Sequence, residues 1–274
     1  MNKETKRTKT YYASRIQDEW NRLVKDPFHR LEFDTTMRYL KEFLPARGLI
    51  LDAGGGPGRY TVELARMGYD VVLLDLLQEH LEYAKKEIKN AGVEKKVKEI
   101  IEGSITDLSR FNNSSFNAVL CLGGPICHVH PESERTKAIK ELIRVAKTNA
   151  PIYVSAMSKY GVLLATPEGW PQEVGNIKYF DDLVATGNDY HFGHTGFCHF
   201  FTSTELRKIL KTRDTEFVAM AGLEGFNSDR QTSNTFAEKY PVAWKNWLKI
   251  NDRMRTDPFV VDASGHMLII VRKK

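Results

Sequence analysis

The stretch LILDAGGGPGRYTVELA, residues 49–65, joins a short apolar run to a segment with helical spacing through a turn that is rich in glycine. LILDA predicts a buried strand, and TVELARMG, residues 61–68, predicts the helix that crosses back over it. A glycine turn between a strand and a helix directs backbone N–H groups toward a ligand, and the missing Cβ atoms let that ligand approach closely. The turn therefore predicts a site for a nucleotide-like cofactor.

Strand-like and helix-like segments alternate from about residue 49 to residue 157, which is typical of a parallel sheet flanked by helices. The pattern continues with a further helix and two late strands. The predicted strands after the first are residues 70–76, 97–103, 116–122, 150–158, 215–225 and 266–274, and the predicted helices between them are residues 80–92, 133–147 and 202–213. We therefore expect an α/β protein with a seven-stranded, mostly parallel sheet and helices on both faces.

Two regions outside this alternation are expected to cover the ligand, because this class of fold leaves it at the open carboxyl ends of the strands. Residues 1–45 predict a lid of two helices, separated near Pro27 and ended by Pro45. Residues 46–274 form the main predicted domain. Within it, residues 159–201 are rich in Gly, His and aromatic residues without a clear period, and we expect an insertion that covers the substrate.

The composition excludes several classes of protein. The 274 residues are 42% hydrophobic and 27% charged, and no apolar run approaches the roughly 20 residues of a membrane-spanning helix. Cys121, Cys127 and Cys198 form no CxxC pair, so neither a disulfide framework nor a cysteine-rich zinc site is predicted. The polar start resembles no secretory signal or membrane anchor, so a cytoplasmic location is expected by default. The net charge of +5 owes much to both ends of the chain, and we expect a solvated basic tail rather than a nucleic-acid partner.

The spacing of the glycines distinguishes between kinds of nucleotide site. A dinucleotide-binding G-x-G-x-x-G pattern needs glycine at position 59 or 61, where the chain has Arg59 and Thr61. A Walker loop is also absent, because no Lys-Ser or Lys-Thr pair follows the glycines. What remains is an acidic residue followed by glycines at alternating positions, namely Asp52, Gly54, Gly56 and Gly58.

At these residues the chain resembles the class I S-adenosylmethionine-dependent methyltransferases, whose first motif is an acidic residue followed by GxGxG at the end of the first strand. The resemblance covers about residues 30–157 and implies a Rossmann-like class I methyltransferase fold with S-adenosyl-L-methionine as cofactor. Asp75 ends the second predicted strand, where such enzymes hold the ribose with a carboxylate that accepts two hydrogen bonds from the vicinal diol. The motif GGP-x-x-H, together with the segments HRLEFDTT and GPGR, resembles a subgroup of small prokaryotic methyltransferases.

The resemblance also implies further contacts with the cofactor. Ser104 and Ile105 stand where the family usually has an acidic and a hydrophobic residue beside the adenine. Arg59 is a candidate partner of the methionine carboxylate, helped by the positive end of the nearby helix, and the alternative is a solvated arginine in the first helical turn. The predicted cofactor-binding residues are Tyr12, Asp52, Gly54, Gly56, Arg59, Asp75, Leu76, Ser104, Ile105, Leu122 and Gly123.

Methyl transfer from an activated sulfonium mainly requires a nucleophile held in line and the exclusion of water. A base is needed where the acceptor must lose a proton, and His128 is the candidate catalytic residue. The alternative for His128 is a loop histidine that bonds the backbone. The segment YHFGHTGFCHFF, residues 190–201, matches no metal-binding spacing, so no metal site is predicted and an aromatic lid is expected there.

These observations predict an S-adenosylmethionine-dependent methyltransferase that transfers a methyl group to a small-molecule acceptor by in-line displacement. Two alternatives stay open at this point. One is a non-catalytic regulatory protein that binds S-adenosylmethionine, and the other is an RNA methyltransferase guided by the basic tail.

Overall fold

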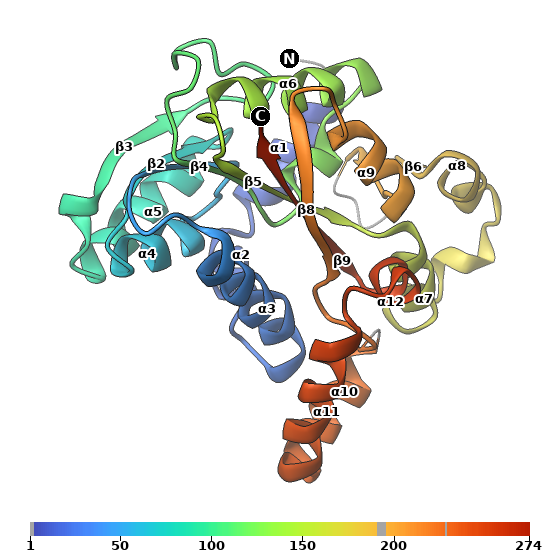
Figure 1. Ribbon diagram of the computed structural model, residues 1–274. Helices are drawn as coiled ribbons and strands as arrows, with labels where there is room; N and C mark the ends of the chain where they lie inside the picture. Colours follow the sequence, from blue (N-terminus) through green and yellow to red (C-terminus); the bar gives the residue numbers. More distant parts are fainter. Residues whose placement is uncertain (1–2, 191–195, 228) are drawn as a thin grey trace.

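Seven strands form one mixed sheet in the centre of the computed structural model, which describes residues 3–190, 196–227 and 229–274 (Figure 1). The strand order is β3-β2-β1-β4-β5-β9-β8, in which β9 pairs antiparallel with β5 and β8 and the other pairs are parallel. The strands are β1 (Leu49–Ala53), β2 (Asp70–Asp75), β3 (Val97–Glu102), β4 (Ala118–Cys121), β5 (Pro151–Met157), β8 (Thr215–Gly222) and β9 (His266–Lys273). This arrangement confirms the predicted α/β, Rossmann-like fold with a mostly parallel sheet.

Helices cover both faces of this sheet. The α-helices are α1 (Lys3–Ala13), α2 (Ile16–Arg22), α3 (Pro27–Phe43), α4 (Arg59–Arg66), α5 (Gln78–Asn90), α6 (Glu132–Val145), α7 (Lys159–Gly169), α8 (Lys178–Thr186), α9 (Ser203–Leu210), α10 (Arg230–Lys239), α11 (Pro241–Met254) and α12 (Pro258–Ala263). Short 3₁₀ turns, η1 (Glu94–Lys96), η2 (Pro125–His128) and η3 (Glu173–Gly175), connect some of them.

The faces are separated by the two-residue alternation of the strands. In β1, Leu51 and Ala53 point into the core cluster that contains residues of α6 and α9, whereas Ile50 points into the cluster that contains residues of α3 and α4. Because a cluster covers each of its faces, β1 is buried on both sides, as expected for a central parallel strand. The carboxyl ends of β1, β2, β3 and β4 therefore open at one edge, between helices on either face.

The N-terminal region differs from its prediction, since it forms three helices rather than two. Asp26 caps α3 by accepting a hydrogen bond from the His29 backbone N–H (2.9 Å), and Pro27 occupies the first turn, where its missing N–H costs nothing. Leu40 of α3 is fully buried against the sheet, so α3 belongs to the core. The basic N-terminus is also not a solvated tail, because residues from Lys3 onward form α1, and Lys9 lies 3.5 Å from Glu102.

The region predicted as an insertion without clear period contains regular structure. It holds α7 and α8, and β6 (Asn188–Asp189) pairs with β7 (Cys198–His199) as a short ribbon apart from the main sheet. Gly161 shows why α7 escaped prediction: a Cβ there would lie 2.1 Å from the Ser264 carbonyl oxygen, so close backbone packing rather than an apolar stripe holds this helix. His191, Phe192 and His194, which the sequence assigned to an aromatic lid or to a metal-like spacing, lie outside the described residues.

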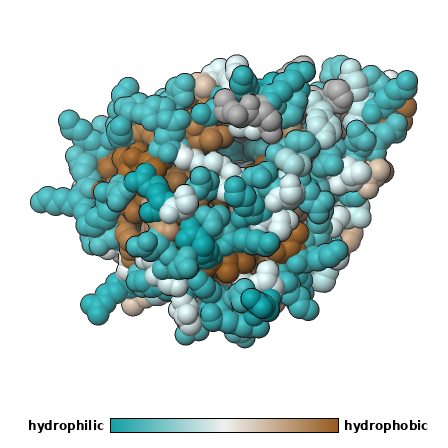
Figure 2. Space-filling model, turned by 90° about the horizontal axis from the view of Figure 1, so that it is seen from above, coloured by the Kyte–Doolittle hydropathy of each residue, from teal (hydrophilic) through white to brown (hydrophobic). Residues whose placement is uncertain are grey.

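Residues 230–263 form α10, α11 and α12, which the sequence pattern had not indicated. In Figure 1, α10 and α11 project from the body of the molecule. They bury little side chain, with Ser233 and Asn251 as their buried residues. In the described part of the chain, no helix combines the length and apolar character needed to cross a membrane. Figure 2 shows one face of the molecule, on which hydrophobic residues gather in patches between hydrophilic ones.

Replacement of Leu40 by Ala tests whether α3 is part of the core. The cavity left beneath the sheet is expected to lower the free energy of unfolding by roughly 2–5 kcal/mol, measured by urea denaturation. Leu164→Ala in α7 is the matched control, because Leu164 is 56% exposed and its truncation should change stability by less than about 0.5 kcal/mol. Equal effects of the two substitutions would contradict the placement of α3.

Candidate active site

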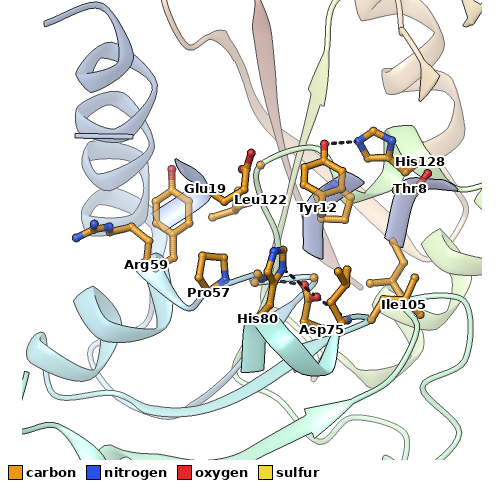
Figure 3. Close-up of a pocket in the computed structure, with 18 of the residues that line it drawn as sticks. Thr8, Tyr12, Glu19, Pro57, Arg59, Asp75, His80, Ile105, Leu122 and His128 are labelled. Carbon is orange, nitrogen blue, oxygen red and sulfur yellow. Dashed lines mark hydrogen bonds and ion pairs between the residues drawn. The ribbon is translucent and has the colours of Figure 1, made fainter. Parts of the chain in front are cut away.

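A pocket lies at the edge of the sheet where β1, β2, β3 and β4 end, and α1 and α2 close it from the N-terminal side (Figure 3). The structure brings most of the predicted site residues together on its wall. Those residues are Tyr12, Gly54, Gly56, Arg59, Asp75, Leu76, Ser104, Ile105, Leu122, Gly123 and His128. The wall also includes residues that the sequence had not singled out, namely Thr8, Glu19, Arg22, Tyr60 and His80.

The glycine turn is shaped by contacts that a side chain would block. Gly54 has φ +78°, and a Cβ on it would lie 2.6 Å from Cγ of Pro125 in the loop after β4. The Gly54 and Gly55 backbone N–H groups donate to the Leu74 carbonyl oxygen (2.7 and 3.2 Å), which ties the turn to β2. The pocket floor is therefore built where the turn after β1 packs against the end of β2 and against the segment that follows β4.

Asp52 lies beneath this turn rather than on the pocket wall, which departs from its predicted contact with the cofactor. Strand alternation turns its side chain into the interior, where it is fully buried and accepts a hydrogen bond from Thr61 Oγ1 (2.7 Å). Burial raises the pKa of Asp52 to about 6. A Cβ on Gly55 would approach Cγ of Asp52 to 2.6 Å, so this carboxyl group supports the glycine turn from below.

Asp75 presents its carboxylate at the centre of the pocket. Its Oδ2 accepts a hydrogen bond from the Gly56 N–H (2.8 Å), and its Oδ1 accepts one from the Leu77 N–H (2.9 Å). His80 lies beside it in Figure 3, and its Nδ1 is 3.4 Å from Asp75 Oδ1. Both ring nitrogens of His80 are buried and make no hydrogen bond within the described chain. The pocket thus holds an oriented carboxylate and an unsatisfied imidazole.

Two arginines reach the pocket: Arg22, which ends α2, and Arg59, which begins α4. Arg59 donates from Nε and Nη2 to the Trp20 carbonyl oxygen (3.2 and 2.6 Å) and stacks on the Trp20 ring, 3.6 Å from its centroid. Arg22, at the end of α2, forms a two-point ion pair with Glu32. Its Nη2 lies 3.7 Å from the position of a Cβ on Gly123, so Arg22 is the cation nearer the loop after β4. No sequence motif marks Arg22, because its position depends on how α2 packs.

Tyr12 and His128 form a hydrogen-bonded pair across the pocket (Figure 3). His128 Nδ1 lies 3.0 Å from the Phe197 carbonyl oxygen, which can only accept, so Nδ1 carries the proton. Nε2 then accepts from the Tyr12 hydroxyl (2.9 Å). Burial lowers the pKa of His128 and raises that of Tyr12 well above its usual value, which keeps both groups neutral.

The described part of the predicted aromatic lid contributes through its backbone and packing. Phe197 is fully buried and holds His128 as just described. His199 is engaged by Asn188 (2.7 Å) and Glu205 (2.7 Å), so it fastens the β6–β7 ribbon to α9. Cys198 is buried beside it.

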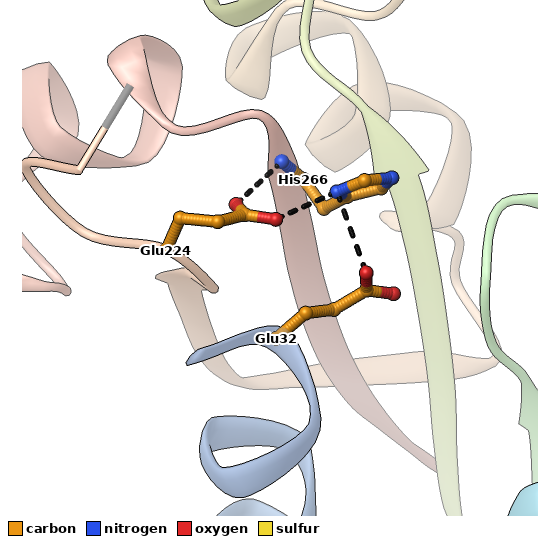
Figure 4. Close-up of side chains that lie close together, drawn as sticks. All are labelled: Glu32, Glu224 and His266. Carbon is orange, nitrogen blue, oxygen red and sulfur yellow. Dashed lines mark hydrogen bonds and ion pairs between the residues drawn. The ribbon is translucent and has the colours of Figure 1, made fainter. Parts of the chain in front are cut away.

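A second polar cluster lies at the same edge of the sheet and consists of Glu32, Glu224 and His266 (Figure 4). His266 Nδ1 lies 2.7 Å from Glu224 Oε1 and 3.7 Å from Glu32 Oε2. One ligand atom from each residue falls within 4.8 Å of the others, a spacing that a metal ion could use. However, Arg22 already occupies both oxygens of Glu32, and Ser264 and His266 donate to Glu224.

Each cation of this cluster is paired with a carboxylate. Burial disfavours every charge here, but Arg22 lowers the pKa of Glu32 to about 2. Burial alone would lower the pKa of His266, whereas the Glu32 and Glu224 carboxylates raise it to about 9. At neutral pH the Glu32 and Glu224 carboxylates therefore face one guanidinium and one imidazolium, and Glu19 lies 3.5 Å from Nε of the same guanidinium.

The raised pKa of His266 predicts a pH dependence of stability. Its folded value of about 9 exceeds the ordinary 6.5, so its contribution, up to about 3 kcal/mol, is complete below pH 6.5 and lost as the pH rises through 9. Urea denaturation from pH 6 to pH 10 should show this loss in the wild type. His266→Gln should be less stable at pH 6 and should lose less stability with rising pH. Parallel pH curves for the two proteins would refute the charge pairing.

Comparison with known proteins agrees with this geometry. Residues 50–149 match a family model described as a methyltransferase domain. The chain is 30% identical over 179 residues to the glycine/sarcosine N-methyltransferase of Parasynechococcus marenigrum, an alignment that covers 64% of this chain and 60% of that protein. It is 26% identical over 156 residues to the enzyme of the same description from Aphanothece halophytica, covering 56% of each. The chain thus spans less than two thirds of the length of these relatives.

Solved structures give the same fold. The chain resembles the 1,6-didemethyltoxoflavin-N1-methyltransferase of Burkholderia thailandensis, solved with S-adenosylhomocysteine, with a TM-score of 0.59 over 98% of this chain and 88% of that one. The identity of 13% makes this a likeness of fold. The family model, the aligned relatives and the sheet order agree, and they show that residues 50–149 are similar to a methyltransferase domain.

Proposed function

We propose that the protein binds S-adenosylmethionine in this pocket and transfers its methyl group to the nitrogen of a small-molecule acceptor. The observation that carries the proposal is Asp75, whose carboxylate is fixed by the Gly56 and Leu77 N–H groups with lone pairs left over for a ligand. A carboxylate oriented in this way suits the two hydroxyls of a ribose. Ile105 and Ser104, after β3, then flank the adenine.

Two further features of the pocket fit this cofactor. The buried nitrogens of His80 make no hydrogen bond in the described chain, although Nδ1 lies 3.4 Å from Asp75 Oδ1. A buried polar group without a hydrogen bond is costly, so a bound polar ligand would relieve that cost. The turn at Gly54 and Gly56 lets backbone approach the ligand without a Cβ in the way. When bound, S-adenosylmethionine supplies an activated methyl group on a sulfonium.

Arg59 takes a smaller part in this proposal than the sequence implied. Its guanidinium is committed to the Trp20 carbonyl and ring, which fixes α2 against the start of α4. We assign it to holding α2 in place as a lid, while Arg22 faces the loop after β4. Through this lid, α1 and α2 exclude water from the pocket.

The acceptor is a small amine in this proposal. The support is the alignment with glycine/sarcosine N-methyltransferases, together with a neutral proton acceptor at the pocket wall. An ammonium must lose a proton before its nitrogen can attack. Tyr12 accepts that proton on its oxygen while donating its own to His128 Nε2, so the pair acts as a general base.

Asp75→Asn tests the cofactor assignment. The substitution removes one charged acceptor, and S-adenosylhomocysteine, titrated calorimetrically, should bind about 10- to 100-fold more weakly. Asp70→Asn, at the other end of β2, is the matched control: Asp70 pairs with Lys98 at the surface, away from the pocket, and binding should be unchanged. An Asp75→Asn protein that binds as tightly as the wild type would contradict the assignment.

His128→Asn tests the base. The amide can still donate to the Phe197 carbonyl but accepts no proton, so kcat should fall by roughly 10²- to 10⁴-fold while S-adenosylhomocysteine affinity changes little. The assay is S-adenosylhomocysteine formation with sarcosine or glycine as acceptor. Asp70→Asn, the surface variant described above, should leave kcat as it is. An unchanged kcat in His128→Asn would rule out the base.

A further inference from the structure

The cluster of Glu32, Glu224 and His266 lies beside the pocket, at the same edge of the sheet. His266 begins β9 and pairs in register with Met157, the last residue of β5, and Glu224 follows the end of β8. Gly123 follows the end of β4. Because β4, β5 and β8 run in the same direction, these residues share the edge of the sheet that carries the pocket.

Arg22 links the cluster to the pocket. Its guanidinium is bound to Glu32 on one side, and its Nη2 lies 3.7 Å from a Cβ position on Gly123 on the pocket wall. Glu32 Oε2 also lies 3.7 Å from His266 Nδ1. The buried carboxylate of Glu32 thus pairs with two cationic side chains, of which Figure 4 shows His266.

His266 has a donor to spare. Its Nδ1 is taken by Glu224, whereas its Nε2 makes no hydrogen bond within the described chain, and 21% of its side chain is exposed. Arg22 gives one N–H each from Nη1 and Nη2 to Glu32, and its Nε lies 3.5 Å from Glu19, so the second N–H groups of Nη1 and Nη2 remain for a ligand. In their charged forms both side chains have hydrogen-bond donors and no acceptor. The ligand that they bind must therefore offer a hydrogen-bond acceptor. An anionic oxygen gains most from such donors.

We propose that Arg22 and His266 bind the carboxylate of an amino-acid acceptor, with Glu32 and Glu224 as positioning residues that hold the two donors. This subsite rests on the proposed methyl transfer. It directs the carboxylate toward β9 and leaves the acceptor nitrogen facing Gly123, Tyr12 and His128. Because each cation is paired with a glutamate, the donors are fixed in place before the ligand arrives.

The test compares ligands with and without a carboxylate. Sarcosine and dimethylamine share the methylated nitrogen and differ in that group, and each is titrated calorimetrically into the protein saturated with S-adenosylhomocysteine. The wild type should bind sarcosine at least tenfold more tightly than dimethylamine. His266→Gln should weaken sarcosine about 10- to 100-fold, and leave dimethylamine and S-adenosylhomocysteine within about twofold.

His199→Gln is the matched control, because His199 is also a buried histidine paired with a glutamate at 2.7 Å but does not line the pocket. It should bind sarcosine like the wild type. Equal weakening of sarcosine and dimethylamine in His266→Gln would overturn the subsite. The comparison of the two ligands in the wild type needs no variant. A wild type that prefers dimethylamine, or that binds both ligands equally tightly, overturns the subsite even if His266→Gln fails to fold. Failure to bind S-adenosylhomocysteine would instead refute the proposed function itself.

Discussion

The pocket depends on the close approach of three loops, which leaves no room for a Cβ at Gly54 or Gly55. Pro125 presses on the first of these glycines and Asp52 supports the second from beneath. Asp75 then joins the turn to β2 through the Gly56 N–H. Because the same contacts set the backbone N–H groups and the Asp75 carboxylate at fixed positions, the proposed cofactor site is formed by the packing of the strand ends.

The charged side chains in and beside the pocket are held in ion pairs. The pocket wall carries Asp75, Arg22 and the neutral pair of Tyr12 and His128, and the formal charges of Arg22 and His266 are each paired with a buried glutamate. A buried charge without a partner would be expensive, so these pairs allow cations to stand near a cationic cofactor without repelling it strongly. The arrangement also joins α2, α3, β8 and β9, which are far apart in sequence, into one support for the acceptor end.

The sequence predicted the sheet and most of the pocket wall because both depend on local patterns. Strand periodicity located β1 within the observed bounds, and the glycine spacing indicated the turn that Asp75 and Gly56 complete. Arg22, Glu224 and His266 were missed, since nothing local distinguishes them from surface charges; only the packing of α2 and the order of β5, β9 and β8 brings them together. The motif that contains Asp52 was identified from local sequence, but Asp52 itself does not line the pocket. Strand alternation turns its side chain into the interior.

The central claim is that S-adenosylmethionine lies on the carboxyl ends of β1 to β4 with its ribose on Asp75. A crystal structure of the protein with S-adenosylhomocysteine tests it most directly. The ribose hydroxyls are predicted within hydrogen-bonding distance of the Asp75 carboxylate, with the adenine beside Ile105 and the sulfur near Gly123. A ligand bound elsewhere, or bound in this pocket without touching Asp75, would contradict the account.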